Sequence, residues 1–258
     1  MNKLYFFFAL AFFVNFKVHS QSNSNSSFNY IHKQIKAKIL NDSVNLVISL
    51  PENYSNSKID YPVVYILDGE WFFFQGVTSQ THFSRFRITP DLIIVGIDAN
   101  RSWYVNNSKQ FNQFLEKELV PFINKEFRTN DERLLFGWEV SGGLVFEVLG
   151  STPDLFTGYL AASPGLLDKT FSESYQYRFE AIKSILKSDK KIDASLFFTT
   201  GKSDFPAQYG VDNLIDLFNK STSGSFDWSY QNLSDENHST TAFKTLHKGI
   251  ESYFNIML

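Results

Sequence analysis

The feature that most constrains the fold is a regular alternation of short apolar runs with longer amphipathic segments. Residues 63–67 and 91–98 are dominated by Val, Ile and Leu, as expected for strands buried on both faces. Residues 108–127 follow, with apolar side chains at three- and four-residue spacing that predict a helix, kinked at Pro121. This alternation favours right-handed β-α-β units, and therefore a mostly parallel sheet with helices on both faces.

The same pattern continues over the rest of the chain. Further strands are expected at residues 30–40, 44–50, 133–137, 158–162, 195–200 and 226–233, and further helices at 141–149, 175–186, 211–218 and 240–254. No internal repeat or long linker interrupts these segments. We therefore expect a single domain over residues 30–258.

The N-terminus has the layout of a secretory signal peptide over residues 1–20. Lys3 precedes an apolar run at residues 4–14, and small residues at Val18 and Ser20 suit cleavage before Gln21. The apolar run is too short to span a bilayer in the mature chain. Residues 21–29 are a Ser- and Asn-rich tract and are expected to be a flexible leader. An exported protein, periplasmic or secreted, is the expectation.

Composition narrows the classes of partner. The chain has 24 Lys and Arg residues, 27 Asp and Glu residues and no basic run. This balance argues against nucleic acid or an anionic membrane surface as a binding partner. It contains no cysteine, so disulfides and a lipid-modified cysteine are excluded. The spacing of His32, His82 and His247 suggests no metal site, and each is interpreted as structural.

Residues 137–143, Gly-Trp-Glu-Val-Ser-Gly-Gly, look like a strand-to-helix nucleophile elbow with an unusual residue at its apex. Such an elbow reads G-x-S-x-G, and the turn is so tight that small residues are needed two positions before and after the nucleophile. Gly137 and Ser141 meet that requirement, which places Glu139 where the serine should stand. The other register makes Ser141 the nucleophile, but puts Glu139 at a cramped position.

Two residues near later strand ends complete a possible catalytic set in the order nucleophile, acid, histidine. His238 lies between the last strand and the last helix, where it could act as a general base or be only a surface histidine. Asp204 follows a strand end, where it could orient the imidazole or be only a turn residue. Asp235 and Glu236 are the alternative acids.

Backbone groups at two strand ends are candidates for an oxyanion hole. One donor would be the N–H of Val140, directly after the elbow position, and the other an N–H in the loop that begins at Gly69 and Glu70. Residues 163–164, Ser-Pro, are expected to shape the floor of the site.

From about residue 31 to its end the chain resembles the putative-esterase family of α/β-hydrolases, and its enterochelin-esterase-like branch in particular. The resemblance lies in the order and spacing of six stretches: residues 61–70, 94–97, 114–123, 153–156, 163–164 and 236–239. It implies the α/β-hydrolase fold and a serine esterase or acyltransferase without metal or cofactor. It also implies that His238 is the base and that the region of Gly69 and Glu70 belongs to the oxyanion hole. The chain departs from the family pattern at residues 137–143, and at 98–107, which lack the Arg-x-x-Asp-x-Thr-Pro pattern.

Three interpretations follow from the elbow. The protein could be a non-catalytic relative that binds a small ester-like, acyl or siderophore-like ligand. Ser141 could act after a local rearrangement, with His238 as its base. Glu139 could itself be the nucleophile or base, as carboxylates are in some relatives of this fold. Substrate choice is expected to lie in loops such as residues 101–107, which carry no recognisable motif.

Overall fold

The computed structural model describes residues 30–165, 173–187, 191–204, 207–221 and 227–256. The predicted signal peptide and leader therefore lie outside the described residues. The strands are β1 (Ile31–Ala37), β2 (Asp42–Ser49), β3 (Tyr61–Leu67), β4 (Ile93–Asp98), β5 (Thr129–Trp138), β6 (Gly158–Ala162), β7 (Ser195–Gly201) and β8 (Asp227–Leu233). The helices are η1 (Tyr54–Asn56), α1 (Gly69–Phe86), α2 (Ser102–Asn106), α3 (Ser108–Phe114), η2 (Leu115–Leu119), α4 (Val120–Glu126), α5 (Val140–Ser151), α6 (Glu173–Lys187), α7 (Ala207–Lys220) and α8 (Thr241–Ile256).

These strands form one eight-stranded sheet in the order β1-β2-β4-β3-β5-β6-β7-β8. The first two strands are antiparallel to each other and β2 is antiparallel to β4, whereas all later pairs are parallel. The predicted class, a mostly parallel sheet with helices on both faces, is confirmed.

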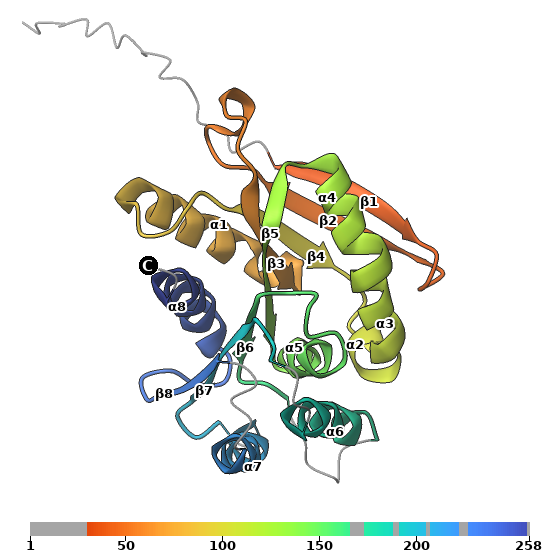
Figure 1. Cartoon of the computed structure of the whole chain (residues 1–258), viewed down its shortest axis with the longest axis vertical. Coiled ribbons are helices and arrows are strands. Elements are labelled where there is room, and N and C mark those ends of the chain that lie inside the picture. Colours follow the sequence, from red (N-terminus) through yellow and green to blue (C-terminus); the bar gives the residue numbers. More distant parts are fainter. Residues whose placement is uncertain (1–29, 166–172, 188–190, 205–206, 222–226, 257–258) are drawn as a thin grey trace, which may run out of the picture.

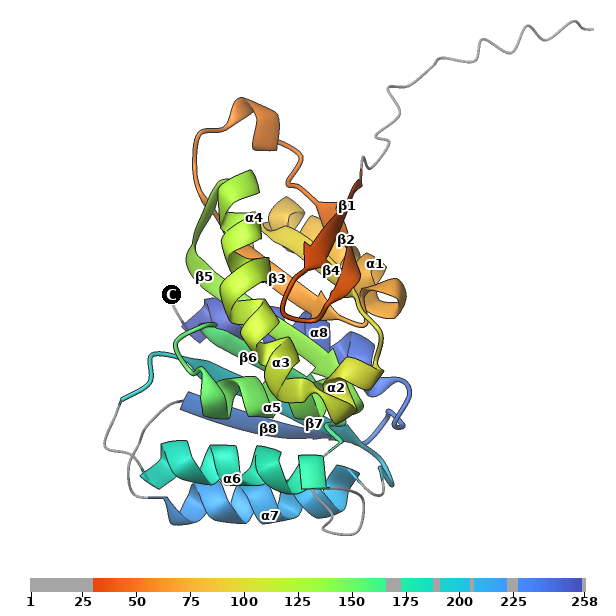
Figure 2. The ribbon, with the colours of Figure 1, turned by 90° about the vertical axis from the view of Figure 1, so that its right-hand side faces the viewer.

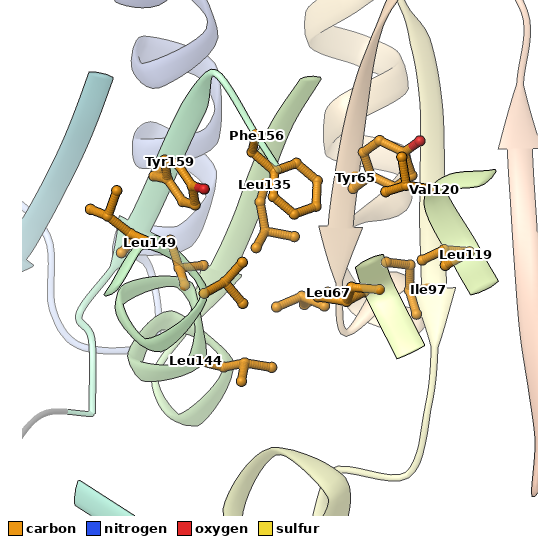
Figure 3. Close-up of a cluster of buried hydrophobic side chains, with 14 of the residues drawn as sticks. Tyr65, Leu67, Ile97, Leu119, Val120, Leu135, Leu144, Leu149, Phe156 and Tyr159 are labelled. Carbon is orange, nitrogen blue, oxygen red and sulfur yellow. The ribbon is translucent and has the colours of Figure 1, made fainter. Parts of the chain in front are cut away.

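Helices cover the two faces of the sheet unequally (Figures 1 and 2). Helices α1 and α8 pack together on one face, where Phe73 and Leu246 meet Ile66 of β3 in one apolar cluster. The larger cluster lies on the other face, where α5 packs against β5 and β6, with α6 beside it. Figure 3 shows Leu144 and Leu149 of α5 in the same apolar cluster as Leu135 of β5. Successive residues of β3 alternate between the two clusters, which is why its sequence is apolar throughout.

The helix predicted at residues 108–127 is present but is not a uniform α-helix. It is divided into α3, the π-helical turn η2 and α4, with Pro121 in the first turn of α4. Proline has no N–H and its ring collides with the carbonyl four residues earlier in a regular helix. The π turn accommodates this defect, because the Val120 N–H bonds the carbonyl of Leu115 five residues back.

Helices α1 and α2 were not predicted, and both border the site. Helix α1 occupies residues for which the sequence suggested no definite element, and α2 occupies part of a segment expected to be a substrate loop. The carboxyl ends of β3, β5, β6 and β7, together with the loop after β8, meet at one edge of the sheet. Ligand sites of open α/β sheets lie at this edge.

Candidate active site

The elbow lies between β5 and α5, and Glu139 is its apex. Glu139 has φ 53° and ψ −114°, a backbone conformation that side-chain-bearing residues rarely adopt. Its carbonyl accepts hydrogen bonds from the N–H groups of Gly143 (2.9 Å) and Gly165 (2.7 Å), which hold the turn. A Cβ on Gly137 would lie 2.4 Å from the Ser141 carbonyl oxygen, so the turn requires glycine there.

Ser141, the alternative nucleophile, is fully buried in the first turn of α5. Its hydroxyl donates to Asp68 Oδ2 over 2.7 Å and accepts from the Trp138 N–H over 2.9 Å. Within the described residues it shares no hydrogen bond with His238. Ser141 thus fastens the elbow to the end of β3, and an attack on a ligand would first require these bonds to break.

Arg101, at the start of α2, joins the elbow to β3. Its Nη2 donates to Glu139 Oε2 over 2.8 Å, and its Nε lies 3.4 Å from Asp68 Oδ1. The guanidinium also lies over two indole rings, 5.0 Å from the centre of Trp71 and 5.7 Å from that of Trp138. The sequence carried no signal for this role, because residues 101–107 were interpreted only as a loop that selects substrate.

Asp68 is the buried carboxylate of this group, with a side chain 1% exposed. Burial raises its pKa, while the hydrogen bond from Ser141 and the charge of Arg101 act in the opposite direction. Asp68 also has a left-handed backbone, φ 53°, directly before α1. Asp68, Ser141, Arg101 and Glu139 therefore form one connected polar group between the ends of β3 and β5.

His238 and Asp204 form the second polar group of the site. His238 Nδ1 lies 2.7 Å from Asp204 Oδ1. The other oxygen of Asp204 accepts from the Gly201 N–H over 3.0 Å and from the hydroxyl of Ser163. Asp235 and Glu236, the alternative acids, pair instead with Lys244, at 3.3 and 2.6 Å. Of the three carboxylates considered, Asp204 is thus the one that contacts the imidazole.

Electrostatics favour the charged forms of this pair. Burial opposes ionisation of Asp204, but hydrogen bonds from His238, Ser163 and Gly201 together lower its pKa. The hydrogen bond to Asp204 raises the pKa of His238 against a smaller effect of burial, and the charges of Asp204 and Glu139 raise it further. The Trp138 indole N–H donates to the His238 carbonyl over 2.8 Å, which ties this loop to the elbow.

The proposed oxyanion donors begin two helices at the same edge of the sheet. Gly69 and Glu70 are the first residues of α1, and Val140 is the first of α5. N–H groups of a first helical turn have no acceptor within their own helix and can point to a ligand. A Cβ on Gly69 would lie 2.6 Å from the backbone nitrogen of Ile97, so glycine lets α1 start directly against β4.

A comparison with models of protein families shows to which family the chain belongs. The model described as putative esterase matches residues 37–253, most of the chain. The chain belongs to the putative-esterase family. No curated protein matches it by sequence.

Solved structures agree with the α/β-hydrolase fold of this family. An IroE-like serine hydrolase from Shewanella oneidensis is 26% identical, with a TM-score of 0.79 over 89% of this chain and 81% of that one. The siderophore hydrolase EstB from Aspergillus nidulans is 15% identical, with a TM-score of 0.74 over 87% and 94%. The enterobactin esterase FES from Shigella flexneri is 16% identical, with a TM-score of 0.72 over 90% of this chain and 60% of its own.

This member of the putative-esterase family combines a conventional histidine–aspartate pair with a carboxylate at the elbow. The pair can accept and return a proton, and the starts of α1 and α5 can donate to an oxygen that gains charge. The elbow itself offers a carboxylate bound to a guanidinium instead of a hydroxyl. Within the described residues no helix is both long and apolar enough to cross a membrane.

Proposed function

We propose that the protein binds a small ester or acyl ligand at the edge of the sheet around Glu139, without forming an acyl-serine intermediate. The observation that carries this proposal is the state of the two possible nucleophiles. Glu139 occupies the strained apex and is paired with Arg101, while Ser141 is buried against Asp68.

The chemistry of the apex supports binding over turnover. Loss of the serine nucleophile costs a serine hydrolase on the order of 10⁶ in turnover number. A carboxylate that attacks an ester forms a mixed anhydride, a less stable product than the ester. The ion pair of Glu139 with Arg101 lowers the nucleophilicity of the carboxylate still further.

The class of ligand follows from the family and from the retained donors. Family membership and siderophore hydrolases among the structural neighbours support a siderophore-like ester or a related acyl compound. The N–H groups of Gly69, Glu70 and Val140 would receive its carbonyl oxygen. His238 would lie beside the bound ester.

A second candidate function is hydrolysis through Glu139 itself, and the intact pair of His238 and Asp204 favours it. In this scheme a Glu139 oxygen bonds to the carbonyl carbon and the ester C–O bond breaks. The leaving alkoxide takes a proton from His238. His238 then removes a proton from water, which opens the anhydride and releases the acid and Glu139.

Assays on short-chain p-nitrophenyl esters separate these functions. We expect little turnover by the parent protein and a gain of about 100-fold or more in Glu139→Ser, because a serine at the apex would meet the base and the oxyanion donors already in place. Robust parental turnover that disappears in Glu139→Gln would support the second candidate. Parental turnover that survives Glu139→Gln but disappears in Ser141→Ala would contradict both.

Binding is tested directly in the parent protein. A thermal-shift screen with catechol siderophores and acylated sugars should show stabilisation by at least one compound. A ligand that raises the Tm of the double variant Glu139→Ala/His238→Ala as much as that of the parent would bind elsewhere, which would contradict the proposal.

We also propose that the protein is exported. Support comes from the signal-peptide layout of residues 1–20, where Lys3 precedes an apolar run and small residues precede Gln21. Mass spectrometry of the protein from its native cells should give a mature chain that begins at Gln21. An intact chain in the cytoplasmic fraction would contradict export.

A further inference from the structure

We infer that Arg101 is the centre of a carboxylate-binding site that Glu139 closes from within, and that a small aromatic carboxylic acid occupies this site when Glu139 moves aside. The inference rests on the proposed function in that the ligand enters at the same edge of the sheet. It goes further than the proposed function because the site would bind a free carboxylic acid as well as an ester.

The first argument is the incomplete use of the guanidinium. Arginine presents five N–H donors in a planar fork that matches a carboxylate. Here Nη2 donates to Glu139, while the buried Nε makes no hydrogen bond within the described residues. Its 3.4 Å approach to Asp68 is an ion pair only. Nε therefore stays beside Asp68, and a planar acid that displaces Glu139 would take over the Nη2 donor.

The second argument is that Glu139 can be displaced. Its side chain is 29% exposed and that of Arg101 is 32% exposed, whereas Asp68 is buried. The Asp68–Arg101 contact would thus hold the guanidinium in place while the Glu139 carboxylate swings into solvent. An incoming carboxylate would replace the charge that Glu139 removes, so the guanidinium would keep two carboxylate partners.

The third argument concerns the aromatic part of the ligand. The rings of Trp71 and Trp138 lie 6.1 Å apart at an angle of 68°, and both lie next to Arg101. Trp71 is 46% exposed, which is unusual for a residue of this size, and so presents ring surface to solvent. A flat aromatic ring attached to the carboxylate would bury this surface against the indoles.

Benzoate is the probe, and benzamide is its neutral counterpart of nearly the same shape. Titration by calorimetry, with tryptophan fluorescence as a second signal, compares the parent protein with Glu139→Ala. Removing the internal carboxylate should tighten benzoate binding by about tenfold or more. Benzamide should bind no better to the variant than to the parent. Glu139→Gln keeps the side-chain volume and should show the same direction of change.

The second variant is the double substitution Glu139→Ala/Arg101→Met, which should lose the gain in benzoate affinity that Glu139→Ala produces. Arg128→Met in the Glu139→Ala background is its matched control, because Arg128 also lies over an aromatic ring, that of Tyr54, outside this site. The control should keep the gain. Equal benzoate affinity in the parent, Glu139→Ala and Glu139→Gln, or a gain that survives Arg101→Met, would overturn the inference.

Failure of this inference is distinguishable from failure of the proposed function. The inference is decided by the affinity for a free acid, whereas the proposed function is decided by turnover and binding of esters. A protein that binds esters but shows no dependence of benzoate binding on Arg101 would retain the proposed function alone.

Discussion

The two polar groups of the site are built on the same backbone framework but differ in what their side chains can do. In the pair of His238 and Asp204, each oxygen of the carboxylate has a donor and the imidazole remains partly exposed. At the elbow, the partly exposed carboxylate of Glu139 is neutralised by Arg101, and the hydroxyl of Ser141 is buried. The same framework can thus hold a histidine–aspartate pair in contact while the adjacent elbow carries a carboxylate paired with an arginine.

The largest expected effect tests whether the pair of His238 and Asp204 can support ester turnover. In the Glu139→Ser background, Asp204→Asn should lower ester turnover by about 10⁴, because the amide would favour the wrong imidazole tautomer. Steady-state kinetics with p-nitrophenyl acetate measure this loss. Asp235→Asn is the control, since Asp235 is exposed and paired with Lys244, and should change little. Equal losses in the two variants would show that the pair is not what drives turnover.

The next effect tests whether the elbow backbone is as constrained as that of an active hydrolase. Gly137→Ala should destabilise the protein by about 3 kcal/mol, because the added Cβ would lie 2.4 Å from the Ser141 carbonyl oxygen. Urea denaturation gives the change. Gly142→Ala is the control for a milder contact: its Cβ would lie 3.1 Å from backbone atoms, which need shift only slightly, and alanine favours the helix, so this variant should lose clearly less stability. A Gly137→Ala protein as stable as this control would mean that the turn relaxes freely.

A smaller effect tests the structural role of Ser141. Ser141→Ala should cost about 2 kcal/mol, because Asp68 would lose a buried hydrogen-bond donor. The pKa of Asp68 is already raised by burial and should rise further. Thermal unfolding of the variant is compared with that of Ser239→Ala, an exposed serine in the loop after β8. Equal Tm values for the two variants would show that the Ser141 hydroxyl does not stabilise the elbow.

The smallest effect is the pH dependence of stability that His238 contributes. Its pKa is raised in the folded state, so its ion pair with Asp204 stabilises the protein fully below the ordinary histidine pKa and less as pH rises through the raised value. His238→Gln should therefore lower the Tm more at acid than at alkaline pH. The free-energy difference should stay under about 1 kcal/mol, because the ring is partly exposed.

His247 provides a control of opposite sign for that measurement. Burial lowers its pKa, so the folded state resists protonation and loses stability as pH falls below the ordinary value. Its neighbours are Ser79, His82 and Glu251, on α1 and α8. His247→Gln should make the Tm less sensitive to acid. The same pH trend in both histidine variants would contradict these assignments.

Much of the fold could be predicted because apolar periodicity records burial directly. Residues 63–67 are apolar at every position, and the structure buries β3 on both faces. Helix α1 was missed because its apolar residues are crowded and mostly aromatic, with exposed Trp71 and Phe74 among them, so they define no clean face. The π turn before Pro121 was missed because a sequence pattern cannot distinguish it from a kink.

The candidate site was predictable where a role depends on local geometry. Gly137 and Ser141 flank Glu139 at spacings that only one turn satisfies, and the structure places Glu139 at its apex. Asp204 could not be preferred to Asp235 and Glu236 from the sequence, because that choice depends on which strand ends lie side by side.

The sequence by itself determined the parallel sheet, the order of its elements and the residue at the elbow apex, because these follow from short-range periodicity and turn stereochemistry. Only the tertiary structure decided the partners of that residue. Arg101 reaches Glu139 across 38 positions of sequence, and Ser141 reaches Asp68 across 73. Such contacts arise when strand ends converge at one edge of the sheet, and no local pattern encodes which charges meet there.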